Sequence, residues 1–184
     1  MSHPDGDAVS GSHPRLSALV ARARERAAGQ LPALALVYPG DVLALDAAAQ
    51  IQRAALARPV LIGPRELIIR AAAEAGVDAG AFEIIDTGAA ASDAAARACE
   101  LARAGDVQAL MKGSLHTDEL MSAVVNKATG LRGPRRISHA FVFDLPRYPK
   151  LLALADCVVN IAPDLKTKRD IVGNAVTLLH QLGI

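Results

Sequence analysis

The stretch DVQALMKGSLHTDELM, residues 106–121, decides which fold the chain can adopt. Its apolar run at 107–111 has the length of a strand and ends at Lys-Gly-Ser, and a further apolar stretch of helical character follows. A buried strand that ends at glycine and leads into a helix is the repeating junction of α/β proteins. Ligands of open parallel sheets bind beyond the carboxyl ends of the strands, so the turn at 112–114 is a candidate site.

The same alternation of strand and helix extends over most of the chain. Short apolar runs bounded by Gly, Pro, Asp or Asn lie at 31–38, 59–63, 82–86, 107–111, 137–145 and 157–162. Longer segments with apolar residues at helical spacing separate the first five runs, and a helix at 16–28 precedes them. This order predicts βαβ units in a mostly parallel sheet with helices on both faces, which is a three-layer α/β/α fold. We place this first domain at residues 15–135.

The pattern changes from about residue 136. The runs at 137–145 and 157–162, with a proline turn and a short apolar run between them, predict a hairpin or antiparallel pieces, and residues 162–184 predict a helix. A group of strands with one helix has little to pack on, so we expect residues 136–184 to be the start of a second, incomplete α/β domain. At the other end of the chain, the polar residues 1–14 predict a disordered tail without a signal peptide.

Composition limits the classes of protein to which the chain can belong. Hydrophobic residues make up 52% of the chain and aromatic residues 3%, so the core is aliphatic. The net charge of +1 argues against a nucleic-acid partner, and no apolar run reaches the ~18 residues of a membrane span. Cys99 and Cys157 lie far apart in apolar surroundings, which indicates buried free thiols and a cytoplasmic location.

The motifs of several large enzyme classes are absent from the sequence. It contains no G-x-G-x-x-G after the first strand, no G-x-x-x-x-G-K-[ST], no H-E-x-x-H and no G-x-S-x-G. These absences argue against a nucleotide kinase, a zinc peptidase and a standard α/β-hydrolase. The spacing of Cys and His fits no zinc site, so we expect no metal.

The turn after the fourth apolar run allows two interpretations. Gly113 lets the backbone approach a ligand, amides at the helix start and the hydroxyls of Ser114 and Thr117 can hold phosphate oxygens, and Lys112 adds a cation. The alternative is ordinary helix capping by Ser114 or Thr117, with the carboxylates that follow complementing the helix dipole. His116 can orient a phosphate or transfer a proton, although a lone histidine is more often a structural hydrogen-bond partner.

Two further polar segments are candidates for the same cleft. Arg132, Arg135 and Arg136 precede the fifth run, and guanidinium groups suit phosphate and diphosphate, with a solvated loop as the alternative. Ser138 follows on the same run. Asp164 lies after the last run, where it either begins a helix or lines a cleft.

Three ordered blocks of the chain resemble the phosphate acetyl/butyryltransferase family. They are KGSLHT at 112–117, RRISH at 135–139 and NIAPDL at 160–165, and the likeness extends from about residue 31 to the end. The Lys-Gly-x-Leu-His-Thr turn is closer to the butyryl-type branch of the family than to the acetyl-type branch.

The resemblance implies two α/β domains of isocitrate-dehydrogenase-like architecture, with an acyl-CoA cleft between them, in a homodimer or a larger homo-oligomer. It implies that an acyl group, acetyl or butyryl, passes from acyl-CoA to inorganic phosphate, which gives acyl phosphate and CoA without a metal or cofactor. The resemblance suggests one set of residues for binding phosphate and acyl-CoA, and these are Lys112, Gly113, Ser114, His116, Thr117, Arg136, Ser138 and Asp164.

The chain also departs from the family pattern. Members are commonly longer, and the resemblance places their catalytic Ser-Arg pair and Asp beyond Ile184, so no catalytic residue can be assigned here. An arginine of the acetyl-type members has no counterpart near Met121 or Ser122. We therefore expect a truncated chain with little or no activity of its own.

Two other classes of function stay open. One is a non-catalytic fragment that binds CoA or only oligomerises. The other is a dehydrogenase of the same architecture, which predicts acidic metal-ligand clusters, and the sequence shows none.

Overall fold

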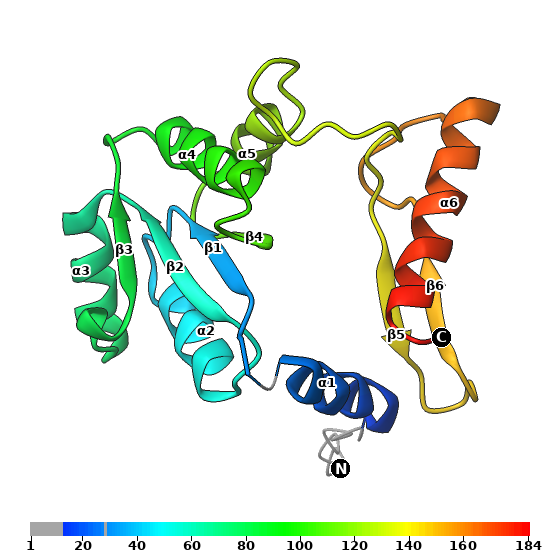
Figure 1. Cartoon of the computed structure of the whole chain (residues 1–184), viewed down its shortest axis with the longest axis horizontal. Helices are drawn as coiled ribbons and strands as arrows, with labels where there is room; N and C mark the ends of the chain where they lie inside the picture. Colours follow the sequence, from blue (N-terminus) through cyan, green and yellow to red (C-terminus); the bar gives the residue numbers. More distant parts are fainter. Residues whose placement is uncertain (1–12, 28) are drawn as a thin grey trace, which may run out of the picture. The chain divides into compact units, whose positions relative to one another are not determined.

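The structure is a computed structural model that describes residues 13–27 and 29–184. It divides into two compact units: one is Ala23–Pro134, and the other joins Arg135–Ile184 to the N-terminal segment that ends at Arg22. The disordered tail predicted at 1–14 lies outside the described residues except for its last two. Of these, Pro14 begins helix α1 (Pro14–Ala27) (Figure 1).

The unit Ala23–Pro134 is built on a parallel sheet. Its strands are β1 (Ala33–Val37), β2 (Arg58–Gly63), β3 (Glu83–Asp86) and β4 (Ala109–Lys112), and they lie in the order β3-β2-β1-β4 (Figure 1). Every pair of neighbours is parallel. The mostly parallel sheet predicted from the alternation of runs is confirmed.

Helices cover both faces of this sheet. They are α2 (Val42–Arg53), α3 (Arg65–Ala75), α4 (Ala91–Ala104) and α5 (Thr117–Val124), with a short 3-10 helix at Ala79–Ala81. Successive strand residues point to opposite faces, so Ala35 and Val37 pack with α4 while Leu36 packs with α2 and α3. Among the described residues, the buried apolar side chains are aliphatic apart from Phe82 and Cys99, as the composition predicts.

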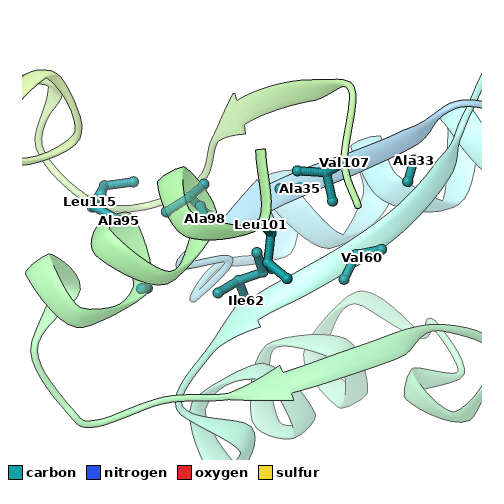
Figure 2. Packing of buried hydrophobic residues seen from close by; sticks show 11 residues of the cluster. Ala33, Ala35, Val60, Ile62, Ala95, Ala98, Leu101, Val107 and Leu115 are labelled. Atoms are coloured by element: carbon teal, nitrogen blue, oxygen red, sulfur yellow. The ribbon is translucent and has the colours of Figure 1, made fainter. Parts of the chain in front are cut away.

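Small side chains allow α4 to lie close to the sheet. Ala95 and Ala98 are fully buried against Val60 and Ile62 of β2 (Figure 2). Leu115, from the turn after β4, belongs to the same cluster and is 2% exposed. The turn that carries the predicted site is therefore anchored in the core by an apolar residue within it.

The second unit contains an antiparallel pair and one helix. Strand β5 (Phe141–Asp144) pairs with β6 (Leu151–Leu154), and α6 (Leu165–Gln181) follows. The predicted hairpin exists, but the strand predicted at 157–162 is wrong: those residues form bends, and the partner of β5 is the apolar run that follows the proline turn.

A carboxylate explains why residues 157–162 do not form a strand. Asp156 Oδ1 accepts hydrogen bonds from the amides of Val158 and Val159, both at 2.9 Å. An aspartate that bonds to the amides two and three residues ahead turns the backbone and removes those donors from a ladder. Cys157 in this turn is exposed, so the predicted burial is correct for Cys99 and wrong for Cys157.

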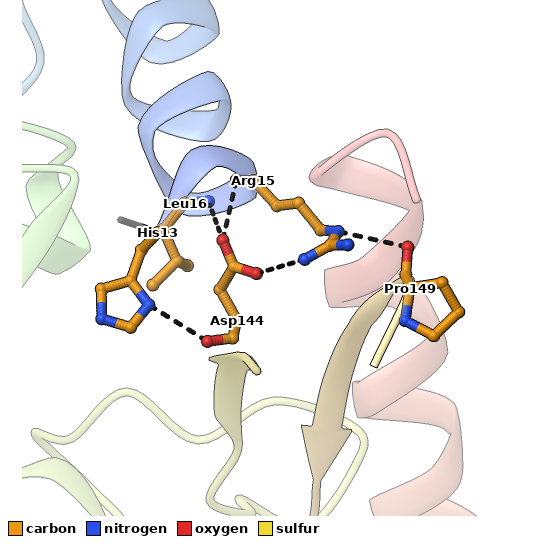
Figure 3. A network of polar contacts seen from close by, with 5 residues as sticks. All are labelled: His13, Arg15, Leu16, Asp144 and Pro149. Atoms are coloured by element: carbon orange, nitrogen blue, oxygen red, sulfur yellow. Dashed lines mark hydrogen bonds and ion pairs between the residues drawn. The ribbon is translucent and has the colours of Figure 1, made fainter. Parts of the chain in front are cut away.

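Asp144 at the end of β5 binds the start of α1 (Figure 3). Its Oδ2 accepts from the amides of Arg15 at 2.8 Å and Leu16 at 3.3 Å, and its Oδ1 accepts from Arg15 Nη1 at 2.7 Å. His13 Nδ1 donates to the Asp144 carbonyl at 3.1 Å, and Arg15 Nε donates to the Pro149 carbonyl at 3.2 Å. Residues 15–22, predicted to belong to the first domain, therefore group with β5 and β6.

The Asp144 carboxyl links this contact to pH. Burial raises its pKa, but the hydrogen bonds from Arg15 and Leu16 and the Arg15 charge outweigh burial, so the pKa lies below its usual value. A carboxyl with a lowered folded pKa stabilises the fold above its unfolded pKa of about 3.9, and this stabilisation is lost as the pH falls toward the folded pKa.

We expect Asp144→Asn to lower the melting temperature at pH 7 and to flatten its dependence on pH between about 5 and 3. Thermal unfolding followed by circular dichroism at a series of pH values measures both effects. Asp106→Asn is the control, because Asp106 is exposed and its carboxylate makes no hydrogen bond among the described residues. Equal pH slopes for wild type and Asp144→Asn would show that Asp144 contributes nothing to acid sensitivity.

Candidate functional site

The strands of the parallel sheet end together at one edge. Val37 of β1 is in register with Ile62 of β2 and with Lys112 of β4, and Gly63 of β2 is in register with Asp86 of β3. The turns that leave these strands therefore share the edge where ligands of parallel sheets bind. The predicted Lys-Gly-Ser turn lies there.

Lys112 closes its own turn. Its Nζ donates to the Leu115 carbonyl at 2.8 Å and to the Gly113 carbonyl at 3.2 Å. An ammonium group has three donors, so one remains for a ligand. The side chain is exposed, which leaves its charge accessible from solvent.

Gly113 lies against the backbone of β1. A Cβ at this position would be 2.6 Å from the Val37 carbonyl oxygen and 2.7 Å from that of Tyr38. These distances are too short for any side chain. The Gly113 amide donates to Val37 and the Ser114 amide to Tyr38, each at 2.9 Å. Because both amides already donate hydrogen bonds to the protein backbone, they are not available as phosphate ligands.

Ser114 connects this turn to the start of α2. Its Oγ accepts from the Gly40 amide at 2.9 Å and donates to Asp41 Oδ2 at 2.8 Å. The other oxygen of Asp41 accepts from the Ala44 amide at 2.8 Å and caps α2. Sequence reasoning missed Asp41, although an aspartate after Pro-Gly and directly before an apolar helical stripe is a signal for a helix start.

His116 is the N-cap residue of α5, in place of the Ser114 or Thr117 considered from the sequence. Its amide donates to Glu119 Oε2 at 2.8 Å, which is one half of a capping box. Thr117 is the first residue of the helix. The side chains of His116 and Thr117 are both exposed at the edge where the strands end.

The second unit brings together Arg136, Ser138 and Asp164 around α6. Asn174 Nδ2 donates to the Arg136 carbonyl at 2.8 Å and to Ser138 Oγ at 2.9 Å. Asp164 caps α6 by accepting from the Thr167 amide at 2.7 Å. Hydrogen bonds from Thr167 lower the Asp164 pKa and outweigh the effect of burial, and the charges of Arg136 and Lys166 lower it further.

Two hollows of the sheet unit are lined by none of the predicted site residues. One of about 490 Å³ is lined by residues at the amino ends of the strands, among them Ala33, Arg58 and Gln108. Among the described residues, no group of His, Cys, Asp and Glu could hold a metal ion.

A family model described as "Phosphate acetyl/butaryl transferase" matches residues 88–184, just over half of the chain. The chain belongs to this family. The match covers both the turn after β4 and the cluster around α6. In the part of the chain that the structure describes, no helix is both long and apolar enough to cross a membrane.

Individual relatives agree with the family match. A phosphate acetyltransferase of Rhizobium meliloti is 45% identical over 90% of this chain and 51% of its own length. A phosphate butyryltransferase of Clostridium acetobutylicum is 33% identical over 84% of this chain and 51% of its own. The chain thus spans about half the length of the curated relatives it matches. The higher identity is to the acetyl-type relative, whereas the turn sequence alone indicated the butyryl-type branch.

A solved structure shows the same fold. The phosphotransacetylase of Streptococcus pyogenes matches 92% of this chain and 60% of its own chain with a TM-score of 0.77 at 18% sequence identity. The α/β fold expected from the family resemblance is therefore confirmed.

We expect Gly113→Ala to destabilise the protein by about 1–3 kcal/mol, because the added methyl group overlaps the β1 carbonyls. Urea unfolding measures the change. Gly133→Ala is the matched control: a Cβ there meets nothing within 4 Å, so its effect stays within about 0.5 kcal/mol. Equal stability of the two variants would mean that β4 does not approach β1 so closely.

Proposed function

We propose that this chain takes part in the transfer of an acyl group, acetyl or butyryl, from acyl-CoA to inorganic phosphate. The observation that carries the proposal is the family match over residues 88–184, together with relatives named phosphate acetyltransferase and phosphate butyryltransferase. The cations and hydroxyls beside the strand ends and α6 support it, because they suit phosphate groups.

The reaction has three physical requirements. A phosphate oxygen must be held against the thioester carbonyl carbon, which is a problem of positioning. The carbonyl oxygen gains negative charge when the new C–O bond forms and needs donors. The C–S bond then breaks, and CoA leaves as a thiolate, which is accessible because the pKa of a thiol is about 8.5.

The chain offers groups for the first requirement. In this proposal the remaining donor of Lys112 and the hydroxyl of Thr117 hold phosphate at the edge of the sheet, and His116 lies beside them. Arg136 supplies a guanidinium fork in the second unit, with Ser138 and Asp164 near it. No catalytic residue is assigned, and the reaction as proposed uses no metal or cofactor.

We also propose, on the family alone, a homodimer or larger homo-oligomer in the cytoplasm. A second candidate function is a non-catalytic piece that binds CoA or associates with other protein. One observation favours it: Ile161 and Leu165 are 95% and 85% exposed. Exposed apolar side chains that form a contiguous patch mark surfaces that another protein covers.

A thiol-release assay with acetyl-CoA and with butyryl-CoA, each with and without phosphate, separates the candidates. Phosphate-dependent release by the 184-residue chain supports acyl transfer by the chain itself. Release that is independent of phosphate rejects phosphorolysis. No release, with CoA still bound in equilibrium dialysis, selects the non-catalytic candidate.

We expect Lys112→Ala to raise the Kd for phosphate about tenfold, because a hydrogen bond from a charged group is lost. Equilibrium dialysis against labelled phosphate measures the Kd and does not require turnover. Lys127→Ala is the control, since Lys127 is an exposed lysine outside the turn. An unchanged Kd in Lys112→Ala removes Lys112 from the phosphate site.

A further inference from the structure

We propose that Asn160 is a positioning residue, which orients the guanidinium group of Arg136 so that its two terminal nitrogens can bind a phosphate group. This inference rests on the proposed function, since it names a residue behind one of the proposed phosphate ligands. It concerns the unit that contains β5, β6 and α6, considered by itself.

The side-chain amide of Asn160 has a partner for each of its polar atoms. Its Oδ1 accepts from Arg136 Nε at 3.0 Å, and its Nδ2 donates to Asp156 Oδ2 at 2.6 Å and to the Ile137 carbonyl at 3.0 Å. Arg136 can only donate, and the other two partners can only accept when Asp156 is ionised. Only one orientation of the amide therefore satisfies all three contacts, and in it Oδ1 faces Arg136.

Asp156 holds Asn160 from the other side. Its Oδ1 accepts from the amides of Val158 and Val159, and its Oδ2 accepts from Asn160. Burial raises the pKa of Asp156, but these hydrogen bonds outweigh it and hold the pKa well below the usual range. Asp156 therefore stays ionised at neutral pH, and the contact between it and Asn160 persists.

The backbone of Arg136 is held at both of its polar groups. Its amide donates to Asp170 Oδ2 at 3.1 Å, and its carbonyl accepts from Asn174 Nδ2 at 2.8 Å. With Nε bound to Asn160, the guanidinium plane is tied at its inner edge. The two η-nitrogens have no hydrogen-bond partner among the described residues, and Arg136 is exposed.

The part of the Arg136 side chain that suits phosphate therefore remains available to a ligand. The η-nitrogens carry four of the five guanidinium donors, in the planar arrangement that matches two phosphate oxygens. A guanidinium group already held in place loses less side-chain freedom when a ligand binds, and this preorganisation strengthens binding.

The neighbouring Arg135 shows a different arrangement. Its Nη1 donates to Thr177 Oγ1 at 3.1 Å and lies 3.4 Å from Asn174 Oδ1, so its terminal nitrogen is used to bind α6. Arg135 therefore has the same charge as Arg136 at the adjacent position, but its guanidinium has an internal role. This makes it a matched control.

The charges near Arg136 do not neutralise its guanidinium directly. The three nearby carboxylates each accept a hydrogen bond from a backbone amide: Asp164 from Thr167, Asp156 from Val158 and Asp170 from Arg136. The charges of Arg136 and Lys166 lower the pKa of Asp164. No ion pair joins Arg136 to a carboxylate in the described part of the chain.

The test is an NMR titration of the ¹⁵N-labelled 184-residue chain, which follows the arginine Nε–H signals. The probes are inorganic phosphate, CoA and dephospho-CoA, so that free phosphate, the 3′-phosphate and the diphosphate are distinguished. Arg136→Ala identifies the Arg136 signal. We expect this signal to shift on titration in wild type, to move and broaden in Asn160→Ala, and the affinity for the bound probe to fall about fivefold to tenfold in that variant.

Two further variants separate positioning from loss of structure. Arg136→Lys keeps the charge and leaves the contact between Asn160 and Asp156 intact, yet it lacks the fork, so we expect the same or a larger loss of affinity. Arg135→Lys is expected to change the affinity less than twofold. Thermal unfolding of each variant shows whether it is folded. If Asn160→Ala is unfolded, the affinity of Arg136→Lys for the probe decides whether the guanidinium fork is needed.

Several results would overturn the inference. If Asn160→Ala binds every probe as wild type does while Arg136→Ala does not, Asn160 has no positioning role. If Arg136→Lys binds normally, or if wild type binds no probe, the fork holds no phosphate group. Binding that depends on Arg136 and Asn160 in a chain without acyl transfer rejects the proposed activity and leaves this inference standing.

Discussion

The turn after β4 runs so close to the backbone of β1 that only a residue without a Cβ fits at position 113. This contact extends the parallel pairing by two hydrogen bonds, to Val37 and Tyr38. It also brings Ser114 to Asp41 at the start of α2 and places Leu115 in the core. The position of Lys112, the direction of α5 and the capping of α2 thus all depend on one close approach between two strands. In the sequence Gly113 is a candidate ligand-binding residue, whereas in the structure it allows this close approach within the sheet.

Much of the sheet unit could be predicted because its signals are repetitive. Each strand is a short apolar run with a breaker at its end, and burial on both faces makes that pattern strong. The strand predicted at 157–162 failed for a local reason. Val158 and Val159 favour strands, but Asp156 binds their amides, and hydrogen bonds between a side chain and nearby backbone compete with a ladder. Asp156 can be seen in the sequence, but the sequence does not show from which amides its carboxylate accepts hydrogen bonds.

The candidate site shows the same division. The residues at the strand end and around α6 became candidates because charged and hydroxyl groups that follow an apolar run are easily recognised in a sequence. Asn160 and Asn174 were missed, since an asparagine carries no charge and its importance depends on distant partners. Asn160 holds Arg136, 24 residues away, and Asn174 holds Ser138, 36 residues away. Periodicity and local spacing carry no information about contacts of this kind.

The second unit is held together differently from the first. Among its described residues, Ile171 is the buried apolar side chain of α6, while Val172 and Val176 on the same helix are 61% and 44% exposed. A pair of strands with one helix is at the lower limit of independent stability. Its order rests on polar contacts such as those of Asp144, Asn160 and Asn174, each of which adds about 1 kcal/mol net.

A unit of this kind gains most from further protein packed on its apolar side chains. Ile161, Leu165 and Val172 are 95%, 85% and 61% exposed, and exposed apolar surface is stabilised when other protein packs on it. The hydrogen bonds that hold Arg136 do not need that addition, because all of their partners lie within the unit. The orientation of Arg136 and the burial of these apolar side chains are therefore separable properties.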